Sequence, residues 1–162
     1  APDFDALSYT WGENIPAVIC CNGHELVVQQ NLFQFLKQLA SNTDFASPRR
    51  HIWIDAICIN QADVKEKGRQ IPLMKDIYST ASRVLVWLGQ AEKGSDLAMD
   101  SLEHIITKLE HLPIDAGAAY VGMLGLDIYN PLWPALGHLF RRAWFRRLWV
   151  VQEVALGKRI IV

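Results

Sequence analysis

One acidic residue near the end of the chain, Glu153, is the first candidate for chemistry. It follows Trp149 by four residues in the run Trp-Val-Val-Gln-Glu, so both side chains would project from one face of a helix. A carboxylate in this setting can stabilise a developing oxocarbenium ion, as in glycoside hydrolysis, while the indole stacks on a base and excludes water. The alternative is a solvated or salt-bridged helix residue near Arg146 or Lys158, because most glutamates lie on protein surfaces.

A second carboxylate, Asp55, lies in the almost continuously apolar run 51–59. Such a β-branched run is typical of a central strand that is buried on both faces of a parallel sheet. A buried carboxylate is costly unless it is paired, so Asp55 requires a donor such as Arg50, a hydroxyl or backbone N–H groups. A structural role suits it better than catalysis. Asn60 and Gln61 follow at the carboxyl end of this strand, outside which ligands bind in open α/β sheets.

The turn after the first predicted strand, 4–9, should reach the same edge of the sheet if the two strands are parallel. Gly12 lies in this turn, where it serves either ligand binding or only the turn itself. We hypothesise that one crevice collects the side chains of Tyr9, Trp11, Glu13, Asn60 and Glu153. The candidate substrate-binding residues are Tyr9, Trp11, Gly12, Glu13, Asp55, Asn60, Gln61 and Trp149, with Glu153 as the catalytic candidate.

Other reactive side chains are weaker candidates. Cys58 would be a nucleophile only beside a base, and in an apolar strand a cysteine usually just packs. The arginines at 141, 142, 146 and 147 meet the phosphates of a dinucleotide or, as is commoner for such clusters, form a solvated helix face or a partner interface. The five histidines are scattered and no CxxC or HExxH occurs, so we predict no metal site.

The elements that must position these residues alternate between strands and helices. Strands are predicted at 4–9, 51–59, 83–88 and 159–162, with a hairpin over 17–28 that turns at Asn22-Gly23. Helices are predicted at 31–39, 63–81, 95–112, 130–140 and 143–156. This order predicts an α/β fold: an open, mostly parallel sheet flanked by helices, with an added β-hairpin and a helical insertion.

Four local signals refine the helices. Asn31 is a predicted helix cap, and Asn130 with the proline after it forms a predicted helix start. Pro72, with Gly68, indicates a late start or a kink in the helix over 63–81. The glycine-rich stretch 116–129 indicates an insertion or a loop.

Composition limits the classes of function. The chain has 162 residues, of which 51% are hydrophobic and 20% charged, and this predicts one globular domain over 1–162. A net charge of −1 argues against nucleic-acid binding, and short apolar runs argue against a membrane span. No secretory signal is visible, and three cysteines in a cytosol-like composition predict free thiols and a cytoplasmic location. The absence of GxGxxG and Walker-type loops disfavours the common nucleotide-binding modes.

Three blocks carry a resemblance to a known family. They are Ala-Leu-Ser-Tyr-Thr-Trp-Gly-Glu at 6–13, Arg-His-Ile-Trp-Ile-Asp-Ala-Ile-Cys-Ile-Asn-Gln at 50–61, and Arg-Ala-Trp-Phe-Arg-Arg-Leu-Trp-Val-Val-Gln-Glu at 142–153. With Val-Trp-Leu-Gly at 86–89, they resemble the signature blocks of the HET domain, the cell-death module of fungal heterokaryon incompatibility proteins. The resemblance implies a trigger of death after non-self recognition, a position at the front of a longer chain, and self-association or a regulatory protein partner.

The HET family is distantly similar to TIR domains, which have a flavodoxin-like fold. The segment 4–9 is similar to the TIR opening strand, and Trp149 to Glu153 resembles the TIR segment Trp-Cys-x-x-Glu, with Val150 in place of the cysteine. In the TIR enzymes that cleave NAD, this glutamate is catalytic. The resemblance therefore implies Glu153 as the catalytic residue, NAD as a candidate dinucleotide substrate and no required cofactor. It equally allows a non-catalytic module that assembles with itself or with a partner.

Overall fold

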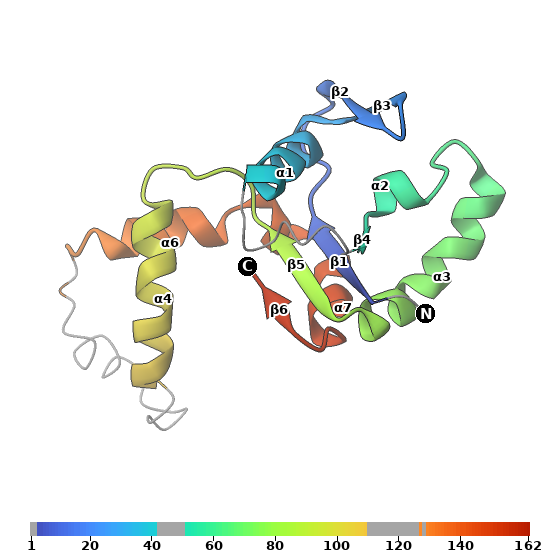
Figure 1. Ribbon diagram of the computed structural model, residues 1–162. Coiled ribbons are helices and arrows are strands. Elements are labelled where there is room, and N and C mark those ends of the chain that lie inside the picture. The colour runs from blue at the N-terminus through green and yellow to red at the C-terminus, as the bar shows by residue number, and fades with distance from the viewer. Residues whose placement is uncertain (1–2, 42–50, 110–126, 128) are drawn as a thin grey trace. The chain divides into compact units, whose positions relative to one another are not determined.

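The computed structural model describes residues 3–41, 51–109, 127 and 129–162 (Figure 1). The chain divides into two compact units. One unit is formed by Ala1–Gly89 together with Ala143–Val162, and the other by Gln90–Arg142. The second unit is therefore inserted into the sequence of the first, in agreement with the predicted helical insertion. The assignment of one domain to 1–162 stays a prediction.

A four-stranded parallel sheet forms the centre of the first unit. Its strands lie in the order β4 (His51–Trp53), β1 (Phe4–Tyr9), β5 (Arg83–Trp87) and β6 (Ile160–Ile161). Each neighbouring pair is parallel. The predicted α/β fold with a mostly parallel sheet is confirmed, and the carboxyl ends of β1 and β4 lie at the same edge.

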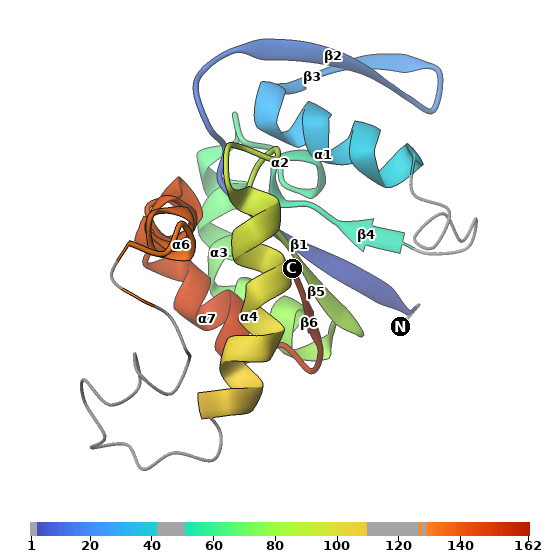
Figure 2. The same cartoon turned by 90° about the vertical axis from the view of Figure 1, so that its left-hand side faces the viewer.

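Helices cover the two faces of this sheet (Figure 2). One face carries α1 (Gln30–Ser41), and the other carries α3 (Val64–Thr80) and α7 (Trp149–Ala155). On the α1 face, Leu7 packs with Leu32. On the other face, Ala6 packs with Tyr78 and Val150. Successive residues of a strand point to opposite faces, so β1 sends alternate side chains into two separate cores.

The hairpin of β2 (Pro16–Cys21) and β3 (His24–Gln29) is antiparallel, as predicted. Its turn residues Asn22 and Gly23 have φ values of 51° and 80°. A type I′ turn requires positive φ at both of these positions, which explains the Asn-Gly pair. Val28 of β3 packs in the same core as α1, so the hairpin is held by one of its faces.

Two helices, α4 (Ser95–Leu109) and α6 (Leu132–Phe140), form the second unit. The Asn130 side chain accepts a hydrogen bond of 2.9 Å from the Leu132 N–H, and the proline between them is in the helical region, so the predicted helix start is confirmed. A Cβ added to Gly94 would lie 3.1 Å from the Cβ of Ala135, which shows how closely these segments approach. Most of the stretch 116–129, and the predicted end of the helix over 95–112, lie outside the described residues.

The prediction of one central strand over 51–59 is wrong. Strand β4 covers only three residues and lies at the edge of the sheet, and a short helix, α2 (Asp55–Cys58), follows it. The Ile54 carbonyl accepts hydrogen bonds from the N–H groups of Ile57 and Cys58, which closes the helical turn. A short apolar run cannot by periodicity alone distinguish a buried strand from a strand followed by a buried helical turn.

The helix predicted over 143–156 is broken. A 3₁₀ turn, η1 (Ala143–Arg146), precedes α7, and Arg147 and Leu148 form a joint between them. The Arg147 N–H donates to the Trp144 carbonyl three residues earlier, so the turn stays tight, while the Arg147 side chain is bonded to other parts of the fold. This joint determines the geometry of the candidate site.

Two further helix details differ from the predictions. Helix α1 begins at Gln30, and Asn31 is not its cap, since the Asn31 side chain donates to the Thr10 carbonyl at 2.6 Å and accepts from the Trp87 indole at 2.9 Å. Helix α3 has no late start, because the Asp63 side chain caps it directly, and Pro72 lies inside it, so the alternative of a kink stays a prediction. The extent of α3 otherwise confirms the helix predicted over 63–81.

Candidate functional site

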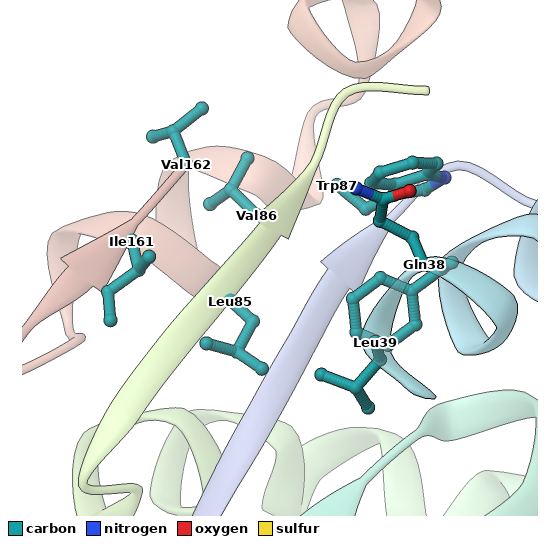
Figure 3. Close-up of a pocket in the computed structure, with 8 residues that line it drawn as sticks. Gln38, Leu39, Leu85, Val86, Trp87, Ile161 and Val162 are labelled. Carbon is teal, nitrogen blue, oxygen red and sulfur yellow. The ribbon is translucent and has the colours of Figure 1, made fainter. Parts of the chain in front are cut away.

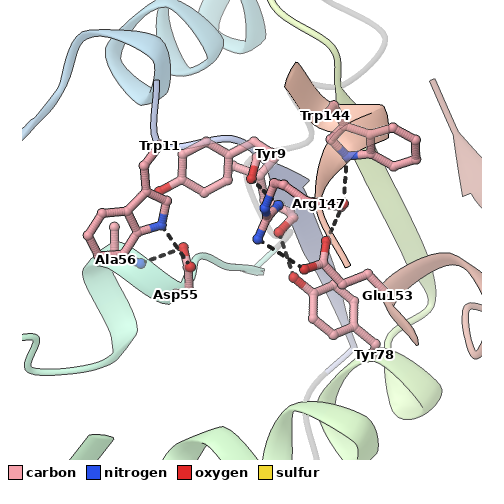
Figure 4. A network of polar contacts seen from close by, with 10 residues as sticks. Tyr9, Trp11, Asp55, Ala56, Tyr78, Trp144, Arg147 and Glu153 are labelled. Atoms are coloured by element: carbon pink, nitrogen blue, oxygen red, sulfur yellow. Dashed lines mark hydrogen bonds and ion pairs between the residues drawn. The ribbon is translucent and has the colours of Figure 1, made fainter. Parts of the chain in front are cut away.

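A buried carboxylate lies beside the carboxyl end of β1. Glu153 of α7 is 2% exposed. Its Oε2 accepts a short hydrogen bond from the Ser8 hydroxyl, and the Ser8 Oγ accepts a hydrogen bond of 2.9 Å from the Trp144 indole (Figure 4). Ser8 and Trp144 are themselves buried, so this side of Glu153 is enclosed.

The other oxygen of Glu153 faces Arg147. The Arg147 Nη2 lies 3.3 Å from Oε1, and its Nη1 donates to the Tyr9 carbonyl at the end of β1. The predicted ionic partners, Arg146 and Lys158, are therefore wrong. Lys158 instead donates to the Thr80 carbonyl at 3.2 Å. One arginine on the joint before α7 thus ties the carboxylate to the end of the central strand.

Burial and bonding act on Glu153 in opposite directions. Burial raises the pKa of Glu153, because the low-dielectric interior disfavours the charged form. The hydrogen bond from Ser8 and the positive charge of Arg147 lower the pKa, and the negative charge of Asp55 raises it. The net result is a raised pKa, and perturbed carboxylates of this kind are common at functional sites.

Asp55 is not in a strand but is the first residue of α2, where it is half-buried. Its Oδ2 accepts from the Trp11 indole at 3.0 Å, and its Oδ1 accepts from the Ala56 N–H at 2.7 Å. The Gln61 side-chain amide donates to the Asp55 carbonyl at 2.9 Å. An indole and a backbone N–H thus supply the donors that the sequence required, while Arg50 lies outside the described residues.

Two phenols lie between the acidic residues. The pKa of Tyr9 is raised, first by burial and then by the charge of Asp55 and a hydrogen bond with it. The pKa of Tyr78 is raised by burial and by the charges of Glu153 and Asp55, while Arg147 lowers both. The Tyr78 hydroxyl donates to the Leu7 carbonyl at 2.9 Å. Both phenols therefore remain neutral hydrogen-bond donors.

The structure brings together three residues of the predicted crevice, Tyr9, Trp11 and Glu153, with two other candidate residues, Asp55 and Gln61. All five belong to the contacts described above, at the carboxyl ends of β1 and β4. In open α/β sheets, ligands bind outside this edge. The residues come from segments far apart in the chain, and the parallel pairing of β1 with β4 explains why they meet.

Four predicted residues, Glu13, Asn60, Gly12 and Trp149, do not join this network in the described contacts. Glu13 is exposed, and its carbonyl accepts from the Ile15 N–H. Asn60 is exposed and caps a local turn, accepting from the Ala62 N–H at 3.1 Å. Gly12 has a φ of 77°, and a Cβ there would lie 3.1 Å from the Cβ of Asn31, so its place in a tight turn is accounted for by structure.

Trp149 and Glu153 both lie in α7, four residues apart as predicted, but their surroundings differ. Trp149 is 51% exposed, whereas Glu153 is buried. Helix α7 begins at Trp149, and its buried stripe consists of Val150 and Glu153, three residues apart. Phe145, Leu148 and Val151 are likewise exposed, so apolar side chains gather on the surface of this segment.

Four residues of the site were not singled out from the sequence as partners of Glu153. They are Ser8, Tyr78, Trp144 and Arg147. Ser8 carried a signal, because it is a polar residue within an apolar strand and therefore needs a partner. Arg147 was visible only as one member of a basic cluster.

Other features carry less chemistry. Cys20, Cys21 and Cys58 are free and exposed, so the prediction that Cys58 packs in a strand is wrong and that of free thiols is confirmed. Within the described ranges, no three His, Cys, Asp or Glu side chains are grouped as for a metal ion. In the same ranges, no helix has the length and hydrophobicity of a membrane span.

A pocket of about 170 Å³ lies elsewhere in the first unit, between α1, β5 and β6 (Figure 3). Its lining is almost entirely apolar and includes Phe35, Leu85, Trp87 and Ile161, with Gln38 as a polar member. It contains no titratable side chain, and we therefore place the candidate chemistry at Glu153 rather than in this pocket.

Comparison with known proteins was made on the whole chain. The family model described as heterokaryon incompatibility protein (HET) matches residues 4–153. The chain is 28% identical over 198 aligned residues to heterokaryon incompatibility protein 6, OR allele, of Neurospora crassa. This alignment covers 96% of the chain, which spans only 28% of that relative. No solved structure matches the chain significantly.

Proposed function

Because the chain belongs to the heterokaryon incompatibility (HET) family, we propose that it is a cell-death domain of non-self recognition that acts by hydrolysing NAD at Glu153. The observation that carries the proposal is the buried, oriented carboxylate at the carboxyl end of β1. Its pKa is raised, and the half-exposed indole of Trp11 lies near the second carboxylate, Asp55. Perturbed acids of this kind cluster at functional sites.

The proposed reaction breaks one bond and forms one. The bond between the ribose C1′ and the nicotinamide nitrogen breaks, and nicotinamide leaves with the electron pair, which neutralises its positive charge. The ionised Glu153 stabilises the positive charge that develops on C1′. A water oxygen then bonds to C1′ and loses a proton to solvent. The products are ADP-ribose and nicotinamide, and nothing is oxidised or reduced.

Three other residues, Trp11, Asp55 and Tyr9, have proposed roles in binding the ligand, and Gln61 has a supporting role. The exposed face of Trp11 can stack on a ring of the ligand, and the hydrogen bond to Asp55 holds the indole in place. Asp55 and the neutral phenol of Tyr9 suit the ribose hydroxyls. The Gln61 side-chain amide donates to the Asp55 backbone carbonyl and so helps to hold Asp55 in place.

A direct test follows nicotinamide release from NAD by the purified protein, under conditions that favour self-assembly. Glu153→Gln keeps the size of the side chain but removes its charge, and we expect turnover to fall by roughly 10²–10⁴-fold. Glu25→Gln is the matched control, because Glu25 is an exposed glutamate on β3. Equal turnover by the wild type and Glu153→Gln would contradict a catalytic Glu153.

A non-catalytic signalling module is the second candidate function. The observation that favours it is the exposed apolar group Phe145, Leu148, Trp149 and Val151, which suits self-association or a protein partner. On this alternative, a Leu148→Ser, Val151→Ser double variant loses cell killing, whereas Glu153→Gln retains it. The reverse outcome supports the enzyme.

A further inference from the structure

The two oxygens of Glu153 lie in different surroundings. Oε2 is bonded to Ser8, which is fully buried and in turn bonded to the buried Trp144. Oε1 faces Arg147, whose side chain is 25% exposed. Oε1 is therefore the oxygen on the solvent side, and in this structure the guanidinium covers it.

Arg147 is bonded in a way that allows exchange of partners. Its two bonds go to two different acceptors, the Tyr9 carbonyl and Oε1 of Glu153, and they use two of the five N–H donors of a guanidinium. The distance to Oε1 is 3.3 Å, longer than the 2.7–2.9 Å that is usual for charge-assisted hydrogen bonds. The residue lies on the joint between η1 and α7, outside regular helix.

The charges around Arg147 favour a particular class of ligand. The charges of Asp55, Glu153 and Arg147 all act on the Tyr78 phenol, and Figure 4 shows these side chains in one network around the end of β1. A ligand that displaces the guanidinium from Glu153 must offer it another anion, and phosphate matches its fork geometry. The same ligand is favoured if it carries a positive charge toward the two carboxylates. A nicotinamide nucleotide has both a pyridinium cation and a phosphate.

We propose that Arg147 covers Oε1 of Glu153 in the ligand-free protein and that the phosphate of a nicotinamide nucleotide draws it away. This inference rests on the proposed function and specifies how its site opens. Arg147 is thus both the cover of the carboxylate and the phosphate-binding residue. The exposed neighbour Arg146 has neither role.

Calorimetric titration of the wild-type protein tests the ligand class. Nicotinamide mononucleotide is compared with nicotinamide riboside, which lacks the phosphate, and with ribose 5-phosphate, which lacks the pyridinium. We expect the mononucleotide to bind about tenfold more tightly than either of the others, since a charge-assisted hydrogen bond contributes this much. Equal affinity for the mononucleotide and the riboside would overturn the proposal.

Variants then assign the preference to one residue. Arg147→Gln should bind the mononucleotide and the riboside equally, whereas the matched control Arg146→Gln should keep the wild-type ratio. Arg147→Lys retains the charge and should keep part of the ratio, and it serves if the glutamine variant does not fold by circular dichroism. If the folded Arg147→Gln protein keeps the wild-type ratio of affinities for the mononucleotide and the riboside, the proposal is contradicted.

The titration tests the role of Arg147 and the turnover assay tests the role of Glu153, so the failure of one proposal can be distinguished from the failure of the other. If Glu153→Gln abolishes turnover but the phosphate makes no difference to binding, the enzyme stands and the role of Arg147 falls. If phosphate-dependent binding is lost in Arg147→Gln but no protein releases nicotinamide, the role of Arg147 in binding stands and the catalytic proposal falls. If none of the three ligands shows saturable binding, the proposal for Arg147 is overturned.

Discussion

Asp5 and Glu153 are the two buried carboxylates near the ends of β1, and they are held differently. Asp5, 1% exposed near the start of the strand, accepts from Nε and Nη2 of Arg83 at 3.0 and 2.5 Å. Glu153, 2% exposed beside the end of the strand, accepts one hydroxyl bond from Ser8 and a 3.3 Å contact from Arg147. The two carboxylates are thus equally buried, but their partners differ. Asp5 is bonded to two nitrogens of one arginine, whereas Glu153 has a hydroxyl donor and a longer contact to its arginine.

The origin of each partner explains the difference. Arg83 lies directly opposite Asp5 in the register of β1 and β5, so the sheet itself fixes that ion pair. Arg147 comes from a joint between two helical segments, and its guanidinium is shared between two acceptors. The degree of burial therefore does not distinguish a structural carboxylate from a functional one, whereas the geometry of its partners does.

The largest expected difference between the two carboxylates is in turnover. Removal of the charge at Glu153 should lower nicotinamide release by roughly 10²–10⁴-fold. Asp5→Asn should leave release per folded molecule near the wild-type value, because Asp5 lies at the other end of the strand. The fraction of folded protein is measured by circular dichroism in parallel. Similar losses in the two variants would remove the distinction between them.

For the free energy of unfolding, we expect the larger effect at Asp5 and the smaller effect at Glu153. Asp5→Asn removes the buried carboxylate that accepts from two nitrogens of Arg83, a side chain that is only 14% exposed, which should cost about 3 kcal/mol. Glu153→Gln should change stability by less than about 1 kcal/mol, since the amide oxygen still accepts from one of the two donors and the side chain no longer carries a buried charge. Urea unfolding of both variants measures this. A larger loss for Glu153→Gln would make Glu153 a structural residue.

The dependence of stability on pH should also differ. Burial raises the pKa of folded Glu153 above the value of 4.5 for the free side chain, so the folded state binds the proton more tightly than the unfolded state. The contribution of Glu153 to stability is therefore fully present below pH 4.5 and is lost as the pH rises through the raised pKa. Relative to Glu153→Gln, the wild type should lose melting temperature over this window. A constant difference would contradict the raised pKa.

The smallest expected effect concerns Trp11. Trp11→Phe keeps an aromatic face but loses the hydrogen bond to Asp55, a loss of about 1 kcal/mol or roughly fivefold in KM for NAD. Because this contact is exposed, the melting temperature should hardly change. Trp133→Phe, in α6 of the second unit, is the control. An unchanged KM in Trp11→Phe would remove Trp11 from the ligand-binding residues.

Much of the fold could be predicted from local signals. The Asn-Gly turn of the hairpin, the strand at 83–88 and the helix over 63–81 each follow from short-range chemistry, and the structure has them. The run 51–59 was wrongly predicted to be one strand, because apolar β-branched residues suit both a strand and a buried helical turn. The break at Arg147 was not visible, because the Arg147 side chain bonds to Glu153 six residues later and to the Tyr9 carbonyl 138 residues earlier, and the second bond exists only in the folded chain.

The candidate site was predictable only in part for the same reason. Glu153 was implied by the resemblance to the TIR segment, and Asp55 was identified from its position in an apolar segment. Their partners depend on which strands are neighbours, since Ser8 and Glu153 meet only after β1 and α7 have packed. Trp149 illustrates the limit: the four-residue spacing was correct, but the start of α7 leaves the indole exposed.

The bond between Ser8 and Glu153 joins positions 145 residues apart, with the second unit inserted between them in the sequence. A ribosome makes the hydroxyl among the first residues of the domain and the carboxylate among the last. A chain interrupted between the second and third signature blocks consequently has Trp11 and Asp55 but neither Arg147 nor Glu153. On the proposed function, activity at Glu153 would therefore begin only after the third block has been translated.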